Sequence, residues 1–138
     1  MILTDTVNIA APIERLWTLT EDIEKWPDIT PTMTSVVRLD RGPLNVGSTA
    51  RVTQPRQRAR VWTVTRFDPN ETFAWQSRIL GMPVTGTHSM VAQGDGIANT
   101  LTLEMAGPIS RLLGPILAST LRRALALENA GFKQHAER

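Results

Sequence analysis

Two side chains of this sequence can transfer protons and also lie within a periodic pattern of apolar residues. His88 alternates with apolar residues such as Met90 along a segment with strand periodicity, whereas the second histidine, His135, lies close to the C-terminus. An imidazole exchanges a proton near neutral pH. Glu128 lies among the apolar residues of the last helical segment, so this carboxylate is the one able to reach the same face. His88, as a general acid/base, and Glu128 are therefore the candidate catalytic residues.

Each of these two residues also has a structural interpretation that stays open. A lone histidine on an apolar strand face is commonly a hydrogen-bonded core residue, and Glu128 could pair with an N–H or an arginine where helix and sheet meet. As a general acid/base, His88 would need its other ring nitrogen to be oriented and its proton partner to lie within about 3 Å.

Large apolar side chains predict the walls of a cavity around this pair. Trp62 and Trp75 fall on one face of two neighbouring strand-like segments, where core packing and ligand contact are compatible roles. Trp26, before Pro27, could lie at the mouth, and Gln54 shares the inward parity of its strand. We expect the ligand-binding residues to be Trp26, Gln54, Trp62, Trp75, His88, Met90, Leu103, Leu117 and Leu121.

The order of the elements that would position these residues is distinctive. One short strand at Thr6–Ile9 is followed by a helical stretch in which Ile13, Leu16 and Trp17 share a face. Six strand-like segments with period-two alternation then follow without a helix among them. One amphipathic helix ends the chain and is suited to cover the apolar face of a curved antiparallel sheet.

The last hairpin is the most specific local prediction. Asp95-Gly96 between two strand-like segments favours a two-residue turn. That register places His88 opposite Leu103 and Met90 opposite Leu101, all on the inner face, and sets Glu104 against Thr87 on the other. A slip of one residue would reverse the two faces.

The pattern of the C-terminal segment predicts a helix from Gly114-Pro115 to about Gln134, after a loose turn over 109–113. The side expected to face away from the sheet carries Asn129 and Lys133. The apolar stripe expected to face the sheet consists of Leu117, Leu121, Ala124, Leu125 and Phe132.

Composition narrows the classes of function. With 138 residues we expect one domain over residues 1–138, burying about two-thirds of its unfolded surface. The sequence has no cysteine and only two histidines without metal-ligand spacing, so we expect no metal site, and no motif indicates a cofactor. No apolar run approaches the ~20 residues of a membrane span, so we expect no membrane insertion. Without a signal-peptide pattern, we expect a cytoplasmic location.

Charge does not point to nucleic acid. The net charge is only +2, and the basic residues of one hairpin come without an exposed aromatic platform or a glycine-rich loop. We therefore expect a solvated charged hairpin and no nucleic-acid partner. The residues concerned are Arg51, Arg56, Arg58, Arg60 and Arg66.

Several stretches resemble a known superfamily over nearly the whole chain. They are Ile9-Ala10-Ala11-Pro12-Ile13-Glu14-Arg15-Leu16-Trp17, Trp26-Pro27-Asp28, Val61-Trp62-Thr63-Val64 before Asp68-Pro69, Thr87-His88 followed by Gly94-Asp95-Gly96, and Gly107-Pro108 ahead of Leu127-Glu128-Asn129. The sequence resembles the START-like, helix-grip superfamily, in particular its polyketide cyclase/dehydrase-like branch. The resemblance implies an α+β helix-grip fold. A curved seven-stranded antiparallel sheet would wrap around a long C-terminal helix, with two short helices after the first strand and a deep cavity for hydrophobic ligands.

Three functions remain as hypotheses. The first is a monomeric or homodimeric binding module for a small hydrophobic molecule such as a lipid, steroid or polyketide. The second is a polyketide cyclase or dehydratase that uses His88 as general acid/base. The third is a regulatory module that binds a partner protein, which would have a filled interior and an exposed apolar patch.

Overall fold

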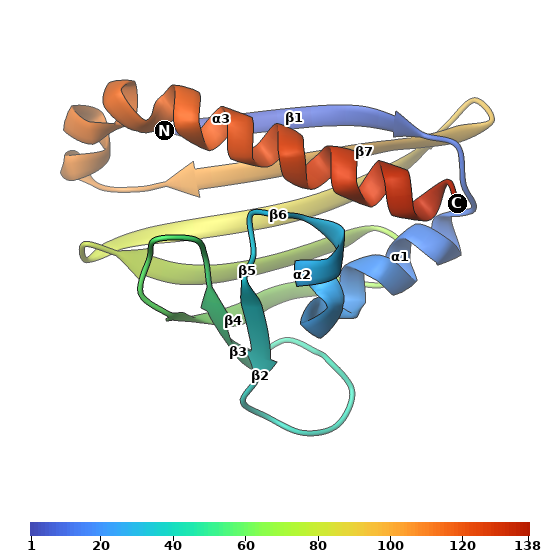
Figure 1. Ribbon diagram of the computed structural model, residues 1–138, viewed down its shortest axis with the longest axis horizontal. Coiled ribbons are helices and arrows are strands. Elements are labelled where there is room, and N and C mark those ends of the chain that lie inside the picture. Colours follow the sequence, from blue (N-terminus) through green and yellow to red (C-terminus); the bar gives the residue numbers. More distant parts are fainter.

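The computed structural model describes residues 1–138 as one curved sheet, one long helix and a short helical segment after the first strand (Figure 1). The helical elements are α1 (Ile13–Glu21), the 3₁₀ turn η1 (Ile23–Lys25), α2 (Trp26–Ile29) and α3 (Pro108–Ala136). The strands are β1 (Ile2–Ile9), β2 (Ser35–Arg38), β3 (Thr49–Thr53), β4 (Arg60–Asp68), β5 (Thr72–Ile79), β6 (Met82–Gln93) and β7 (Gly96–Met105).

All seven strands form one antiparallel sheet in the order β1-β7-β6-β5-β4-β3-β2. Each strand therefore pairs with its neighbour in sequence, except β1, which returns to pair with β7. Helix α3 runs across the sheet along β1 and β7, and α1 lies beside its C-terminal end (Figure 1). This arrangement confirms the predicted helix-grip fold. None of the helices is both long enough and apolar enough to cross a bilayer.

Aromatic rings fill the space between α3 and the sheet on the side of α1 and α2. The ring of Trp26 is fully buried, with centroids 5.7 Å from Phe73, 5.0 Å from Trp75 and 5.6 Å from Phe132. All three contacts are edge-to-face, the geometry that aromatic quadrupoles favour. The indole N–H of Trp26 donates to the carbonyl of Leu19 at 3.1 Å, so the burial of this large side chain leaves no polar atom unpaired.

The predicted turn of the β6–β7 hairpin is wrong by one position. Gln93 pairs with Gly96, so the two loop residues are Gly94 and Asp95. Gly94 has φ +59°, whereas Asp95 keeps a negative φ. A glycine at the first central position suits a type II′ turn, which competes with the expected aspartate-glycine turn.

The new register moves every predicted β6–β7 pair by two residues. His88 lies opposite Leu101, and Met90 lies opposite Asn99. Glu104 lies opposite Thr85 rather than Thr87. Because a shift of two residues preserves the alternation of faces, His88 still points inward, as predicted.

Helix α3 begins at Pro108, earlier than predicted, and continues through Pro115. A proline inside a helix removes one hydrogen bond, here to the carbonyl of Arg111. Arg111 is exposed, so that carbonyl can be solvated. Ser110 stabilises the first turn by donating its hydroxyl to the carbonyl of Gly107 at 2.6 Å.

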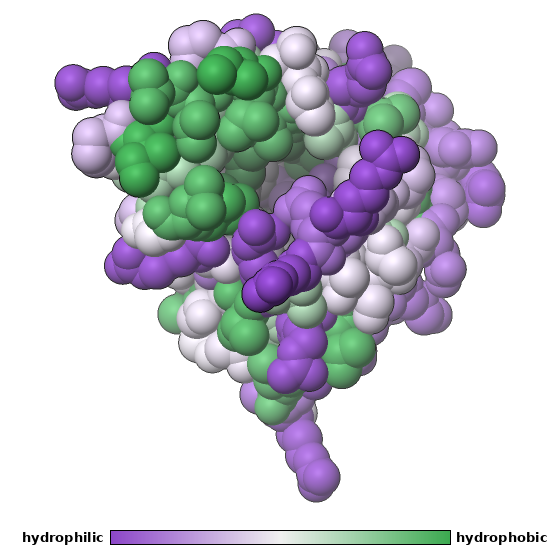
Figure 2. All heavy atoms as spheres, turned by 60° about the vertical axis from the view of Figure 1, so that its left-hand side comes forward, coloured by the Kyte–Doolittle hydropathy of each residue, from purple (hydrophilic) through white to green (hydrophobic).

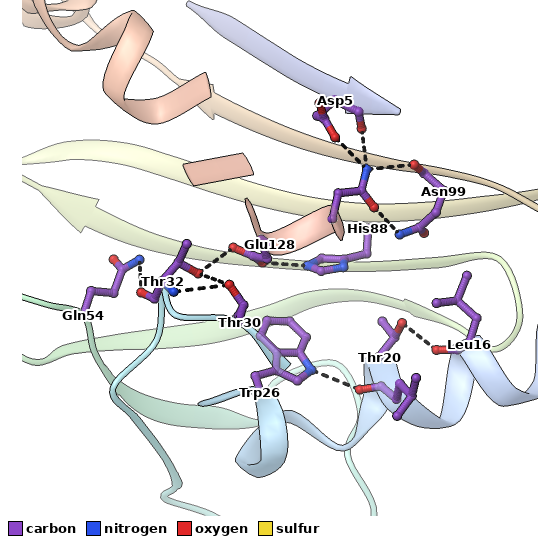
Figure 3. A network of polar contacts seen from close by, with 12 residues as sticks. Asp5, Leu16, Thr20, Trp26, Thr30, Thr32, Gln54, His88, Asn99 and Glu128 are labelled. Atoms are coloured by element: carbon purple, nitrogen blue, oxygen red, sulfur yellow. Dashed lines mark hydrogen bonds and ion pairs between the residues drawn. The ribbon is translucent and has the colours of Figure 1, made fainter. Parts of the chain in front are cut away.

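The assignment of Asn129 to the outer side of α3 is also wrong. Its side chain is fully buried, and its amide accepts from Asn99 Nδ2 at 2.9 Å and donates to the carbonyl of Asn99 at 3.1 Å. The Nδ2 atom of Asn129 also donates to the carbonyl and to the carboxylate of Asp5, both at 3.0 Å. These bonds join α3 to β1 and β7 (Figure 3). Polar side chains that bond to each other in a core cannot be recognised from hydrophobic periodicity.

Candidate functional site

A cavity of about 380 Å³ lies between the inner face of the sheet and the middle of α3. Most of the side chains around it are apolar. The predicted ligand-binding residues that line it are Gln54, Trp62, Trp75, His88, Leu103, Leu117 and Leu121, and the predicted catalytic residue Glu128 joins them. The strands β4 to β7 thus form one wall, and α3 forms the other.

Two tryptophans form the flat part of the sheet wall. The rings of Trp62 and Trp75 have centroids 5.3 Å apart and are inclined by 36°. Trp75 pairs across the sheet with Gly86, which also lines the cavity. A methyl group at Gly86 would lie 3.4 Å from the Trp75 ring and 3.9 Å from Trp62. A methyl group at Gly86 would therefore contact both rings, and a larger side chain there would take up cavity space in front of them.

The polar corner of the cavity consists of His88 and Glu128. The Nε2 atom of His88 on β6 lies 3.5 Å from Oε1 of Glu128 on α3, and the two side chains are only 5% and 13% exposed (Figure 3). The sequence predicted both residues and their meeting across the cavity. With both groups shielded from water, their interaction is stronger than that of an exposed pair.

Aromatic packing, rather than a hydrogen bond, orients the imidazole of His88. Its Nδ1 atom is buried and has no hydrogen-bond partner. The ring lies 4.8 Å from the Trp26 ring at an angle of 35°, and 5.2 Å from Phe132 at 74°. The familiar arrangement in which a third group fixes the histidine tautomer is thus absent. The imidazole and the carboxylate therefore act together: the pair can donate a proton to a ligand in the cavity or accept one from it.

The loop between α2 and β2 holds the other oxygen of the carboxylate. The hydroxyl of Thr32 donates to Glu128 Oε2 at 3.2 Å and lies 2.9 Å from the hydroxyl of Thr30. Gln54 on the segment after β3 donates its amide to the carbonyl of Thr32 at 3.3 Å. The result is a polar chain from Gln54 through Thr32 and Glu128 to His88 (Figure 3). Thr32 was not predicted, because nothing in a short loop sequence indicates which distant carboxylate it meets.

Two residues expected in the ligand wall lie elsewhere. Trp26 does not line the cavity because its ring is enclosed by Phe73, Phe132 and Trp75 in the adjoining core. Met90 shares the inward face of β6 with His88, but it lies further along the strand, where it is packed into the core. The cavity occupies only the end of the sheet that the aromatic cluster leaves open.

Comparison with known proteins adds a family to this geometry. A family model described as "Polyketide cyclase / dehydrase and lipid transport" matches residues 2–137. The match therefore includes every residue of the cavity.

Solved structures share the fold at low sequence identity. The protein TTHA0849 from Thermus thermophilus is 18% identical with a TM-score of 0.77, over 99% of this chain and 97% of that one. The Zhui aromatase/cyclase from Streptomyces sp. R1128 is 20% identical with a TM-score of 0.79, over 100% and 94%. The hypothetical protein jhp0584 from Helicobacter pylori is 8% identical with a TM-score of 0.85, over 99% and 88%. Identities this low show a common fold alone.

Proposed function

Because this chain belongs to the family of polyketide cyclases, dehydrases and lipid-transport proteins, we propose that it encloses a small hydrophobic molecule between the sheet and α3. The observation that carries the proposal is an apolar cavity with one polar corner, formed by His88 and Glu128. Ligand sites of this type are mostly apolar, with a few placed polar groups that fix orientation. The cavity volume of about 380 Å³ lies within the range typical of such sites.

The geometry favours a ligand with a flat apolar part and one hydroxyl or carbonyl group. The apolar part would stack on Trp62 and Trp75, and the oxygen would lie against the imidazole and carboxylate pair. Steroids and aromatic polyketides meet this description, whereas a fatty acid provides the apolar part and the polar group without the flat surface. The third hypothesis, a partner-binding module with a filled interior, is disfavoured by the free volume of the cavity.

The test is a fluorescence titration of the native tryptophans with fatty acids, steroids and aromatic polyketides. We expect saturable quenching by at least one class, and weaker binding by Leu121→Phe, which narrows the cavity from the helix side. The matched control is Leu127→Phe, a change on the same helix at a side chain that is 47% exposed. Quenching that is unaffected by Leu121→Phe would show that the molecule binds elsewhere. Mass spectrometry of molecules co-purified with the protein would identify the natural ligand.

A second candidate function is aldol cyclisation or dehydration of a poly-β-keto chain. The facing of His88 and Glu128 favours it, because Glu128 would stabilise the imidazolium formed when His88 accepts a proton. His88 would remove a proton from a methylene between two carbonyls, and the resulting enolate carbon would attack a third carbonyl. The new alkoxide would take the proton back, and the loss of water would complete a dehydration. The cavity would hold the chain folded for this step.

Turnover and binding distinguish the two functions. If the protein is a cyclase, His88→Ala should abolish turnover of a poly-β-keto substrate and leave binding of the product measurable. If the protein bound members of a substrate panel but converted none of them, a carrier function would be favoured over a cyclase.

A further inference from the structure

One end of the molecule exposes large apolar side chains that the fold could have buried. Leu80 is 73% exposed, Leu112 75% and Ile116 71%, and Ile109 beside them is 42% exposed. We call these four residues the rim patch. Figure 2, which brings this end of the molecule forward, shows hydrophobic residues gathered into one area. A grouped apolar area on a protein surface marks a site of interaction.

Two elements distant in sequence bring the rim patch together. Leu80 lies in the turn between β5 and β6, and the other three residues lie in the first turns of α3. The N–H of Ala106 donates to the carbonyl of Pro83 at 3.1 Å, which places the start of α3 against the start of β6. On α3, Ile109, Leu112 and Ile116 follow the three- and four-residue spacing of one helix face.

The rim patch adjoins residues of the cavity wall along the chain. Ile79, next to Leu80, lines the cavity, and so does Leu117, next to Ile116. Leu117 is also 36% exposed, so this side chain belongs both to the cavity wall and to the surface beside the rim patch.

Arginines flank the rim patch on both of its elements. Arg111 lies in the first turns of α3, next to Leu112, and Arg78 is held at the β5–β6 turn by its bond to the carbonyl of Gly81 at 3.0 Å. No acidic residue occurs between Glu71 and Asp95, nor between Glu104 and Glu128. The first turn of α3 has no acidic residue either, so the positive end of its helix dipole is uncompensated. The patch thus combines apolar side chains with a cationic border.

We propose that the rim patch docks onto the surface of an anionic lipid bilayer. Leu80, Leu112 and Ile116 would enter the acyl boundary, and the arginines would contact lipid phosphates, as at interfacial helices. A second copy of the chain fits less well, because a two-fold interface would place one cationic border against another. The proposal deepens the proposed function, since docking would let a hydrophobic ligand move between bilayer and cavity without crossing water.

The experiment is flotation of the full chain with phosphatidylcholine vesicles prepared with and without phosphatidylglycerol. We expect binding only to the anionic vesicles. The variant Leu80→Ser/Leu112→Ser/Ile116→Ser should weaken this binding by about tenfold or more, because it removes the inserted apolar area. Replacing Arg78 and Arg111 by Gln should weaken binding and reduce its sensitivity to salt.

Matched controls use exposed residues elsewhere. Val61→Ser/Val91→Ser changes side chains that are 47% and 62% exposed, and Arg41→Gln/Arg66→Gln removes two positive charges from exposed residues that do not line the cavity. Both controls should bind vesicles like the wild type. Thermal melting of each variant confirms folding.

Three outcomes would overturn the proposal. They are a lack of vesicle binding, an equal loss in the controls, and a dimer in sedimentation that only the serine variant dissociates. The last outcome would assign the patch to a second copy. Titration with a soluble ligand tests the proposed function separately from membrane docking. A serine variant that binds the ligand but not vesicles would show that the cavity is intact and that only the docking surface is lost. If the protein bound vesicles but no ligand, membrane docking would be supported and ligand binding in the cavity would be refuted.

Discussion

The Nε2 atom of His88 lies 3.5 Å from Oε1 of Glu128, although one residue belongs to the middle of the sheet and the other to the helix that covers it. The pair is therefore both the polar corner of the cavity and a direct link between its two walls. A change in either residue should affect the stability of the fold as well as ligand binding.

A double-mutant cycle with His88→Phe and Glu128→Gln should reveal a coupling of about 1–3 kcal/mol in urea unfolding, because the two side chains are in contact and shielded from solvent. The control cycle uses Arg66 and Asp68, whose side chains are 64% and 42% exposed. Exposed pairs contribute about 0–1 kcal/mol, so a cavity pair with no more coupling than this control would contradict the expectation.

The free space in front of the tryptophans depends on Gly86. This glycine has an ordinary strand conformation, so a side chain is allowed there, and it would project toward Trp75 and Trp62. We expect Gly86→Val to fill part of the cavity and to raise the Kd of a bound ligand by about tenfold or more, since the ligand would lose its contact with the rings. The melting temperature should change little. A variant that binds as tightly as the wild type would place the ligand away from the tryptophans.

The contrast between predicted and unpredicted site residues has a physical reason. Trp62, Trp75, His88 and Leu103 were placed correctly because a strand alternates between two faces, so parity alone decides which residues point inward. The hairpin register was wrong by two residues, and parity survived that error.

Position along a strand or helix does not follow from parity. Trp26 and Met90 point inward, yet the aromatic cluster fills their part of the interior, and no periodicity shows where the core ends and the cavity begins. Thr32 and Asn129 were missed because their partners, Glu128 and Asn99, are distant in sequence. Such contacts become visible only once the chain is folded.

Close packing of α3 on α2 provides a stability prediction. A methyl group at Gly131 would lie 2.2 Å from the carbonyl oxygen of Ile29, a backbone atom that cannot move alone. We expect Gly131→Ala to lower the free energy of unfolding by about 1–3 kcal/mol, because the two helices must separate. Urea unfolding measures this loss.

Gly114→Ala is the matched control on the same helix. Its methyl group would lie 2.9 Å from the sulfur of Met1, which belongs to a flexible side chain that can rotate away. Alanine also has a helix propensity about 1 kcal/mol more favourable than glycine, so this variant should be neutral or more stable. If both variants lost the same stability, the close approach of α3 to Ile29 would not be the cause.

The C-terminal end of α3 provides a pH-dependent contact. Glu137 accepts a hydrogen bond from the N–H of Ala10 at 2.8 Å and pairs with Lys133 at 2.8 Å, which joins α3 to the segment between β1 and α1. These interactions, the Ala10 bond first, lower the pKa of the Glu137 carboxyl below its ordinary value of 4.5 and outweigh the opposing effect of desolvation.

A pKa that is lower in the folded state means that the charged carboxylate stabilises folding. This contribution is fully present above the unfolded value and is lost as the pH falls through the folded one. We therefore expect Glu137→Gln to lower the free energy of unfolding at neutral pH, and the difference from the wild type to shrink as the pH falls below the ordinary carboxyl value of 4.5. High salt should reduce the difference at neutral pH, because the site is exposed. Glu104→Gln, which removes an exposed carboxylate with no side-chain hydrogen bond, is the control and should show no such dependence. Urea unfolding across this pH range measures the stability of both variants. If the difference between Glu137→Gln and the wild type did not depend on pH, the charge of the carboxylate would not stabilise the C-terminal end of α3.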